Sequence, residues 1–477
     1  MKMKHFCFLL IFSFFFFMEA YTQKIDAEWV KKNYAKREVM IPMRDGTRLF
    51  TAIYEPVSGS DKHPILITRT PYKAGPYGLE MSSMLWNSWS NYSREGYILI
   101  IQDVRGRWMS EGQFVDIRPF NAKKKKKTDV DEASDAYDTV DWLIKHIKNN
   151  NGRVGFIGTS YPGFYAMMAA LSNHPAVRAI CTGAPVTDWF MGDDIHHNGA
   201  LMLTDAFHFL SGVGRPRPVP VMAQSSALPF YQTDEYSFFL KSEGIKNLSS
   251  LLGDSIKFWN EVMQHPNYDS WWQARNVRPN CYNIKPAVLV VGGTFDAEDC
   301  YGTLGTYKTI NQQSPQTKLN IILGPWAHGK WNTSNVNSLG NIYFGGNTSD
   351  YYRNNVEFPF LNYYLKGEGA IDSLGKATVF FSGSNQWQRF TEWPSKQVVM
   401  TPLYLAEKGT LQFTAPVSEN SYSEYISDPA HPVPYIDKIV RGRGTDYMTA
   451  DQRFASFRPD VLTFETQPLS ADLTLGG

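Results

Sequence analysis

The sequence predicts an α/β protein that is built on a mostly parallel sheet and carries a helical segment and a β-rich segment. In the first part of the chain, short apolar runs typical of buried strands alternate with amphipathic stretches. The middle part is rich in aromatic residues and proline, and it has helical periodicity without clear strands. The last part has short alternating runs separated by turn residues, which is typical of an all-β domain.

Length and charge narrow the classes of protein that this chain can represent. Its 477 residues suffice for two or three domains with a large core. A net charge of +1 argues against a nucleic-acid-binding protein. The one basic block, Lys123 to Lys127, is followed by acidic residues. We interpret it as a solvated loop that leads into a helix.

The N-terminus has the pattern of a secretory signal peptide over residues 1–20. Lys2 and Lys4 precede an apolar run, Phe6 to Met18, which is too short to span a bilayer, and the small residue Ala20 could precede the cleavage site. We therefore expect an exported protein, periplasmic or secreted. No later segment reaches membrane-spanning length, so we expect no stable membrane insertion after the signal is removed.

Cysteine is sparse in the chain. Cys7 would leave with the signal peptide, so that Cys181, Cys281 and Cys300 remain. Three cysteines are too few for a disulfide framework, although one disulfide between two of them is possible.

The predicted elements define the domains. An α/β domain is expected over 21–190 and 282–357, a helical insertion over 191–281, and a β domain that ends incomplete over 358–477. The expected elements of the α/β part are a hairpin over 38–54 that turns at Asp45-Gly46, strands at 63–68, 97–102, 154–157, 179–181, 287–291 and 319–323, and helices at 135–147 and 165–171. The expected β-domain strands are 377–381, 398–405 and 461–464.

Ser160 lies between an apolar strand pattern at 154–157 and a helical pattern at 165–171. Strand, Gly-x-Ser turn and helix are the context of a nucleophile elbow. Gly158 and Gly163 supply the small residues that such a turn needs, although the second glycine comes one place later than in G-x-S-x-G. A serine in a glycine-rich turn is often only a turn, but the flanking elements favour a nucleophile.

Asp296 and His328 are the candidate partners of Ser160. They follow the strands at 287–291 and 319–323, at the sheet edge where Ser160 also lies. Alone, His328 would be an ordinary surface or core histidine. The three positions together, in the order Ser, Asp, His, predict a catalytic triad with Ser160 as nucleophile, His328 as base and Asp296 orienting it.

A triad of this kind needs two hydrogen-bond donors for the oxyanion. The backbone N–H of Tyr161, directly after the nucleophile, is one candidate. Tyr72, which follows Pro71 in an early loop, could supply its hydroxyl as the second. The alternative is a tyrosine that is simply packed in a turn.

Acidic residues gather near the predicted triad. Glu298 and Asp299 follow Asp296, and Asp194 lies where the helical insertion begins. Such a cluster can be a surface loop, a metal site, or an anionic pocket for a substrate ammonium group, because a buried positive charge must be paired.

These residues resemble the α-amino acid ester hydrolases, which are related to cocaine esterase, glutaryl-cephalosporin acylases and X-Pro dipeptidyl peptidases. The motifs that carry the resemblance are Gly158-Thr-Ser-Tyr-x-Gly163-Phe, His174-Pro-Ala, Met191-Gly-Asp-Asp194, Arg69-Thr-Pro-Tyr72, Asp103-Val-Arg-Gly-Arg107, Asp296-x-Glu-Asp299 and Gly324-Pro-Trp-x-His328. The resemblance implies an α/β-hydrolase domain, a helical cap and a C-terminal jelly roll, here incomplete. It also implies that Asp194, Glu298 and Asp299 bind the α-ammonium group of the substrate, without a metal or cofactor. Members are often homo-oligomers.

The function implied is acyl transfer through an acyl-enzyme, from esters or amides of α-amino acids, including β-lactam antibiotics with an α-amino acyl side chain. An X-Pro dipeptidyl peptidase, an aminopeptidase or a general carboxylesterase of the cocaine-esterase type is the alternative enzyme. A carbohydrate- or cell-surface-binding protein with a vestigial hydrolase domain is the alternative of another class.

Overall fold

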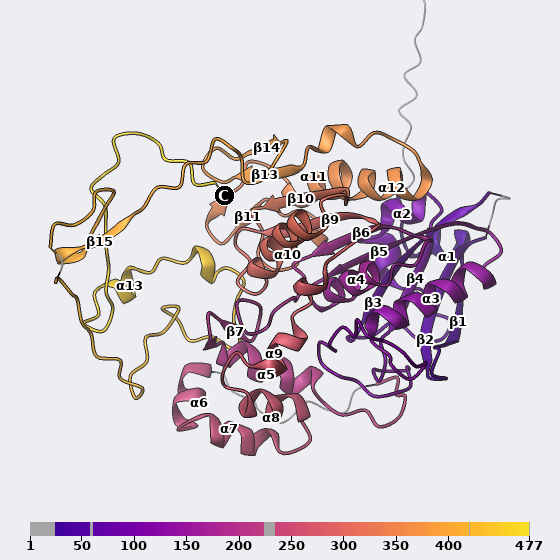
Figure 1. Cartoon of the computed structure of the whole chain (residues 1–477), viewed down its shortest axis with the longest axis horizontal. Coiled ribbons are helices and arrows are strands. Elements are labelled where there is room, and N and C mark those ends of the chain that lie inside the picture. The colour runs from indigo at the N-terminus through magenta and orange to yellow at the C-terminus, as the bar shows by residue number, and fades with distance from the viewer. Residues whose placement is uncertain (1–23, 58–60, 224–233, 419, 477) are drawn as a thin grey trace, which may run out of the picture.

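A computed structural model describes residues 24–57, 61–223, 234–418 and 420–476, so the signal peptide expected over 1–20 lies outside the described residues (Figure 1). Ten strands form one sheet in the order β1-β2-β4-β3-β5-β6-β9-β10-β13-β14. They are β1 Tyr34–Pro42, β2 Arg48–Pro56, β3 His63–Thr70, β4 Ile98–Asp103, β5 Asn150–Thr159, β6 Val177–Gly183, β9 Ala287–Gly293, β10 Leu319–Gly324, β13 Ala377–Phe381 and β14 Gln386–Phe390. The strands from β4 to β13 are parallel, which confirms the predicted α/β class.

The predicted hairpin is present as β1 and β2, which pair in antiparallel register from Tyr34 with Pro56 to Pro42 with Arg48. Gly46 takes the positive φ of +88° that the connecting turn requires. The strand β2 then pairs with β4 and so joins the hairpin to the parallel strands.

Helices cover both faces of the sheet, because neighbouring residues of each strand enter different cores. In β3, for example, Ile65 and Ile67 belong to one core and Leu66 to the other. The first core includes residues of α3 Glu132–His146, α4 Tyr161–Leu171 and α10 Cys300–Gln313. The second includes residues of α1 Ala27–Asn33, α2 Ser90–Arg94, α11 Thr348–Tyr352 and α12 Phe358–Lys366.

Two helices of the first face begin earlier than their periodicity predicts. Helix α3 begins at Glu132 because Asp131 and Ser134 form a capping box. Helix α4 begins at Tyr161, immediately after the predicted nucleophile. The strand β5 therefore leads into α4 through Ser160 alone, which places this residue at a sharp corner of the backbone.

The segment 191–281 contains helices and two short strands, and it shares the first core. The helices are α5 Leu203–Val213, α6 Glu235–Lys241, α7 Ile245–Leu252, α8 Lys257–Gln264 and α9 Ser270–Arg275, and the strands are β7 His196–His197 and β8 Ala200–Leu201. Trp259 and Trp272 are fully buried between these helices. The segment lies beside α10 and below the sheet in the view of Figure 1.

The C-terminal part differs from the expectation. The run 377–381, predicted for a separate β domain, is β13 and pairs with β10 of the main sheet. The run 398–405 contributes only the start of β15 Tyr404–Ala406, which pairs with β16 Thr410–Gln412, and near 461–464 there is a single bridge between Thr410 and Glu465. A strand needs partners on its edges, and the described residues of this part supply few. The jelly roll is therefore not confirmed.

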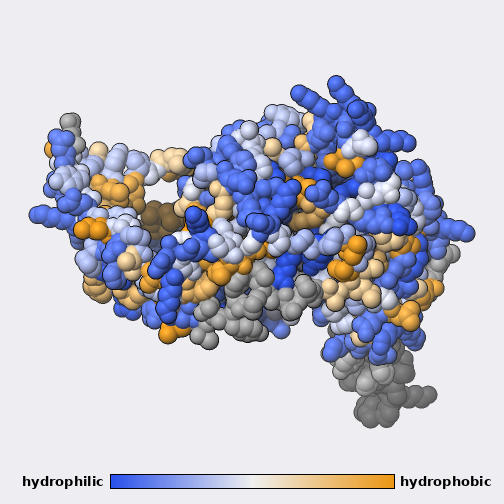
Figure 2. Space-filling view, turned by 90° about the horizontal axis from the view of Figure 1, so that it is seen from below, coloured by the Kyte–Doolittle hydropathy of each residue, from blue (hydrophilic) through white to orange (hydrophobic). Residues whose placement is uncertain are grey.

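Beyond β14 the chain extends away from the body and is mostly exposed (Figures 1 and 2). Its described residues also form the short α-helix α13 Arg453–Ser456 and two single-turn 3-10 helices, Glu407–Gly409 and Tyr447–Thr449. The strands β11 Ser338–Leu339 and β12 Ile342–Tyr343 form a small sheet upstream. Within the described ranges, none of the helices is long and apolar enough to cross a bilayer. Cys181, Cys281 and Cys300 are all free, so the bridge left open by the sequence is not formed.

Candidate active site

Ser160 has a strained backbone, with φ +65° and ψ −127°. A non-glycine residue in this region costs about 1–3 kcal/mol, which the surrounding structure must offset. The Ser160 N–H donates to the carbonyl of Gly183 on β6 at 2.9 Å, which holds the corner in place. Strain at a single half-buried turn residue between a strand and a helix is what a nucleophile elbow predicts.

The glycines around Ser160 are required by close backbone contacts. A Cβ at Gly158 would lie 2.2 Å from the carbonyl oxygen of Pro162, and one at Gly163 would lie 2.8 Å from the carbonyl oxygen of Gly183. The second glycine is therefore needed where the α4 helix passes β6, three places after the serine. This packing explains why the motif reads G-x-S-x-x-G here.

Asp296 and His328 lie in the loops after β9 and β10 and contact each other. The Nδ1 of His328 is 2.9 Å from Oδ2 and 3.1 Å from Oδ1 of Asp296. Asp296 also accepts the backbone N–H groups of Glu298 and Asp299. The loop of His328 is tied to the end of β5, because the Asn332 amide donates to the Thr159 hydroxyl at 2.8 Å. This link holds the His328 loop against the strand that ends in Ser160.

The charges around His328 favour its protonated form. Burial by itself lowers the pKa of His328, but Asp296, followed by Glu298 and Asp194, raises it to about 9. Burial likewise opposes ionisation of Asp296, and the imidazole outweighs it, so the pKa of Asp296 is lowered. The Nε2 of His328 is 3.4 Å from Oε2 of Glu298 and 3.8 Å from Oδ2 of Asp299.

Tyr72 lies near Ser160, whose side chain acts to lower the pKa of the Tyr72 hydroxyl. The residue as a whole is 40% exposed. Arg107 Nε and Trp108 Nε1 both donate to the carbonyl of Pro71, at 3.1 and 2.9 Å, and so fix the loop. Burial of the hydroxyl and the nearby Asp194 raise the pKa of Tyr72, so the group stays a proton donor at neutral pH.

Tyr161 offers only its backbone to the site. Its side chain is buried, where its hydroxyl accepts the Ile117 N–H at 2.7 Å and donates to Asp116 at 3.3 Å. The backbone N–H begins helix α4, whose N-terminal N–H groups have no partner within the helix. The placement is compatible with the predicted oxyanion donor.

The predicted carboxylate cluster is assembled next to His328. Asp194 has φ +30° and accepts the Trp189 Nε1–H at 2.8 Å, and its own N–H donates to the Glu298 carbonyl at 3.3 Å. The neighbouring Asp193 is used structurally, because its carboxylate accepts the N–H groups of Thr187 and Gly302.

Asp299 is the most exceptional member of the cluster. It is fully buried, and among the described residues no N–H or O–H group donates to either of its carboxylate oxygens. Burial, followed by the adjacent Asp194, raises the pKa of Asp299 well above its usual range. Burial and Glu298 raise the pKa of Asp194 to about 6, and its carboxyl contacts that of Asp299. Burial and the neighbouring carboxylates therefore disfavour the ionised forms of Asp194 and Asp299.

These observations separate the three readings of the cluster. A solvated surface loop does not fit, because Asp299 is completely buried. Within the part of the chain that the structure describes, no group of His, Cys, Asp and Glu side chains has the arrangement of a metal site. The burial of Asp299 is compatible with a pocket for a positively charged group.

Arg443 also reaches the cluster, and sequence reasoning missed it. Its Nε donates to Asp205 on α5 at 2.8 Å, and its Nη2 donates to Oε1 of Glu298 at 2.6 Å. The residue lies in an irregular part of the chain, 145 positions from Glu298. No periodicity or motif marks it, so the sequence holds no signal that would have found it.

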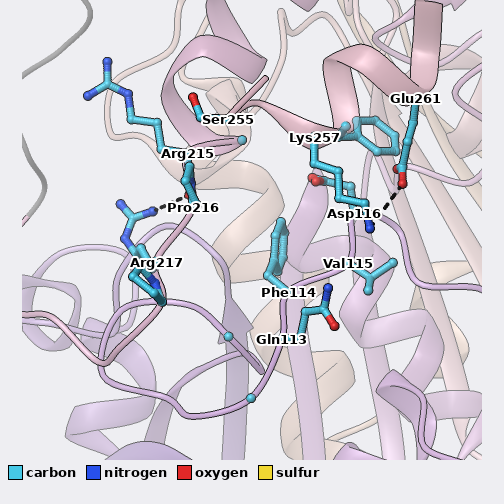
Figure 3. A pocket seen from close by; sticks show the side chains of 15 residues that line it. Gln113, Phe114, Val115, Asp116, Arg215, Pro216, Arg217, Ser255, Lys257 and Glu261 are labelled. Carbon is cyan, nitrogen blue, oxygen red and sulfur yellow. Dashed lines mark hydrogen bonds and ion pairs between the residues drawn. The ribbon is translucent and has the colours of Figure 1, made fainter. Parts of the chain in front are cut away.

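Two cavities border the site. One of about 230 Å³ is lined by Tyr72, Trp108 and Phe209 together with Arg107, His208, Gly212 and Val213, so it opens beside the predicted oxyanion tyrosine. Another of about 370 Å³ lies between the loop that contains Phe114 and Asp116 and helix α8 (Figure 3). Its wall includes Asp116, which binds the Tyr161 hydroxyl, and the ion pair between Lys257 and Glu261 at 3.5 Å. Of the two cavities, the first is the one lined by the predicted oxyanion tyrosine Tyr72.

Comparison with known proteins places this geometry in a family. Residues 45–330 match the family described as X-Pro dipeptidyl-peptidase (S15 family). Cocaine esterase from Rhodococcus sp. (strain MB1 Bresler) is 26% identical over 458 residues, which cover 92% of this chain and 75% of that protein.

Two solved structures are more similar in sequence. An aminopeptidase from the marine sediment archaeon Thaumarchaeota archaeon is 35% identical with a TM-score of 0.84, and the match covers 92% of this chain and 72% of that one. An α-amino acid ester hydrolase is 33% identical with a TM-score of 0.83, and the match covers 95% of this chain and 76% of that one.

Proposed function

The chain belongs to the S15 family and is a serine hydrolase, and from this premise we propose that it cleaves or transfers acyl groups that carry a free α-amino group. The observation that carries the proposal is the buried, donor-free carboxylate of Asp299, together with Asp194 and Glu298, beside His328. A buried negative cluster is stabilised by a cation, and a substrate ammonium group would be one.

In the proposed mechanism, Ser160 Oγ attacks the ester or amide carbonyl while Nε2 of His328 takes its proton. Asp296 holds the imidazole through Nδ1 and stabilises its positive form. The Tyr72 hydroxyl and the Tyr161 N–H stabilise the oxyanion. His328 then gives its proton to the leaving alcohol or amine, and water or an acceptor amine such as a β-lactam nucleus resolves the acyl-enzyme.

The ammonium group would also prepare the base. In the unliganded site the carboxylates raise the pKa of His328 to about 9, so most of the histidine is protonated at neutral pH. A substrate cation among Asp194, Glu298 and Asp299 would offset those charges and lower the pKa of His328. The substrate that fits the pocket would thus favour the neutral imidazole that the first step needs.

Cleavage of peptides from their N-terminus is a second candidate function. A peptide's free α-ammonium would occupy the same carboxylate cluster, and the 35% identical structure is that of an aminopeptidase. The esterase and peptidase activities would use the same serine and histidine, so substrate comparison is needed to separate them. We also propose that the protein is exported, on the pattern of residues 1–20.

A matched substrate pair tests the proposal. Phenylglycine methyl ester and phenylacetic acid methyl ester differ only in the α-amino group. We expect kcat/KM to favour the amino ester by about a hundredfold or more, equivalent to about 3 kcal/mol. Ser160→Ala gives the background rate. Equal rates on the two esters would overturn the ammonium pocket and leave a general carboxylesterase. Peptides with free and acetylated N-termini give the same comparison for the peptidase activity.

A further inference from the structure

Arg443 joins three parts of the molecule at the edge of the active site. Its guanidinium binds Asp205 on helix α5 and Glu298 in the loop after β9, while the residue itself belongs to the C-terminal segment. Only 13% of its side chain is exposed. Burial opposes its charge, but Asp205 and Glu298 outweigh burial and raise the pKa of Arg443, so it stays a cation at every working pH.

Glu298 lies between this fixed cation and the predicted base. Its Oε1 is 2.6 Å from Nη2 of Arg443, and its Oε2 is 3.4 Å from Nε2 of His328. The atom Nε2 must be free of its proton to accept the one from Ser160. An unneutralised carboxylate at this distance would hold the proton on Nε2 and would delay that step.

We propose that Arg443 is a positioning residue of the active site: by pairing with Glu298 it keeps that carboxylate from holding the proton on His328 Nε2. The inference rests on the serine–histidine part of the proposed function and not on the choice of substrate. Arg443 also leaves Asp194 and Asp299 as the members of the cluster without an arginine partner among the described residues.

Several titratable groups surround His328 and Arg443, and all of them affect the pH dependence that the test measures. The groups that face His328 are Asp296, Glu298, Asp299 and Asp194. Those that face Arg443 are Asp205, Glu298, Tyr447, His197 and Tyr435. Arg443 is the cation that directly contacts Glu298. Removal of the Arg443 charge therefore makes the surroundings of His328 more negative.

The test measures how fast a neutral fluorophosphonate labels Ser160 between pH 5 and pH 10.5. Labelling forms the Ser160 Oγ–P bond and releases fluoride while His328 takes the serine proton, so its rate reports the neutral fraction of His328. The probe carries no ammonium group, so substrate preference does not enter. We expect the midpoint in Arg443→Gln to lie about half a pH unit or more above that of the wild type. Arg443→Lys, which keeps the charge, should return the midpoint toward the wild-type value.

Arg453→Gln is the matched control, because Arg453 belongs to the same segment and pairs with Asp451 on the surface. It should leave the midpoint unchanged. The proposal is overturned if Arg443→Gln keeps the wild-type midpoint, or if Arg443→Lys moves as far as Arg443→Gln. Should Arg443→Gln fail to fold, Glu298→Gln replaces it. That variant should lower the midpoint, and an unchanged midpoint would likewise overturn the role of Arg443.

The two proposals fail separately. A wild-type enzyme that is labelled but does not prefer the amino ester would refute the ammonium pocket and leave the Arg443 test valid. A wild-type enzyme with the preference and an Arg443→Gln midpoint equal to its own would refute only the role of Arg443.

Discussion

At the scale of single residues, the burial of the Asp299 carboxyl group is unfavourable to stability at neutral pH. A carboxylate that is fully buried without a donor has its pKa raised by burial and by Asp194. For such a group the folded state binds more protons than the unfolded chain between the unfolded pKa and the raised folded pKa. Asp299 therefore destabilises the folded protein at a pH above its pKa in the unfolded chain. The destabilisation disappears at a pH below its pKa in both the folded and the unfolded state.

Asp299→Asn should accordingly stabilise the protein at pH 7.5 and have little effect near pH 3.5. Asparagine keeps the shape and removes the carboxyl group whose ionisation is opposed by burial. We expect a higher Tm at pH 7.5, by about 2–4 °C for a stabilisation of about 1 kcal/mol, measured by calorimetry. The same variant should lose kcat/KM on phenylglycine methyl ester at least tenfold more than on the desamino ester. A Tm gain that is equal at both pH values would contradict the buried-charge argument.

The sequence could predict the residues that follow strands but not those that reach the site from irregular chain. Ser160, Asp296 and His328 could be found because each comes directly after an apolar strand pattern. In the structure each of the three follows a strand, β5, β9 or β10, and their roles stay predictions. Arg443 approaches from a segment without periodicity, and its partners are fixed only by tertiary structure. Long-range ion pairs of this kind leave no local signal.

At the scale of elements, the corner between β5 and α4 depends on how closely the helix approaches β6. Gly163 is the contact point, because its Cβ position lies 2.8 Å from the Gly183 carbonyl and 3.1 Å from the Cα of Pro185. The obstacles are backbone atoms, which cannot move aside without shifting a strand. The conformation of Ser160 depends on the same contact, since its N–H binds the Gly183 carbonyl.

Gly163→Ala should therefore destabilise the protein by about 1–3 kcal/mol and impair labelling of Ser160. Gly383→Ala is the matched control, because nothing lies within 4 Å of the Cβ position there. For Gly163→Ala we expect a lower urea concentration at the unfolding midpoint and labelling of Ser160 that is at least tenfold slower. For Gly383→Ala we expect both values to equal those of the wild type. Equal behaviour of the two variants would show that helix α4 can adjust.

The parallel strands could be predicted from sequence because they are buried on both faces and read as continuous apolar runs. All of the strand patterns at 63–68, 97–102, 154–157, 287–291 and 319–323 correspond to strands of the sheet. The alternating runs after residue 390 are typical of strands, but a strand forms only where a neighbour completes its hydrogen bonds. That depends on the arrangement of the whole domain, which local patterns do not contain.

For the whole molecule, the burial pattern separates the α/β body from the C-terminal segment. Both large cores end with residues no later than Trp393, and after β14 the buried apolar side chains are Ile436 and Ala455. The segment also exposes apolar side chains such as Val399, Met400 and Val417. Figure 2 shows hydrophobic residues on the surface of the extension. The C-terminal segment thus contributes little to the hydrophobic stabilisation of the body. It does contribute Arg443 to the active site.

A chain truncated after Lys396 should separate these two contributions. All ten strands of the sheet and both cores are retained, so we expect the body to unfold cooperatively with a Tm within about 5 °C of the full chain. The loss of Arg443 should shift the pH midpoint of Ser160 labelling upward, as in Arg443→Gln, because Glu298 then faces His328 without its cation. Calorimetry and labelling of the same preparation measure both effects. A truncated chain that does not fold would show that the segment stabilises the body through contacts other than buried apolar area. An unshifted midpoint in a folded one would contradict the role of Arg443 at His328.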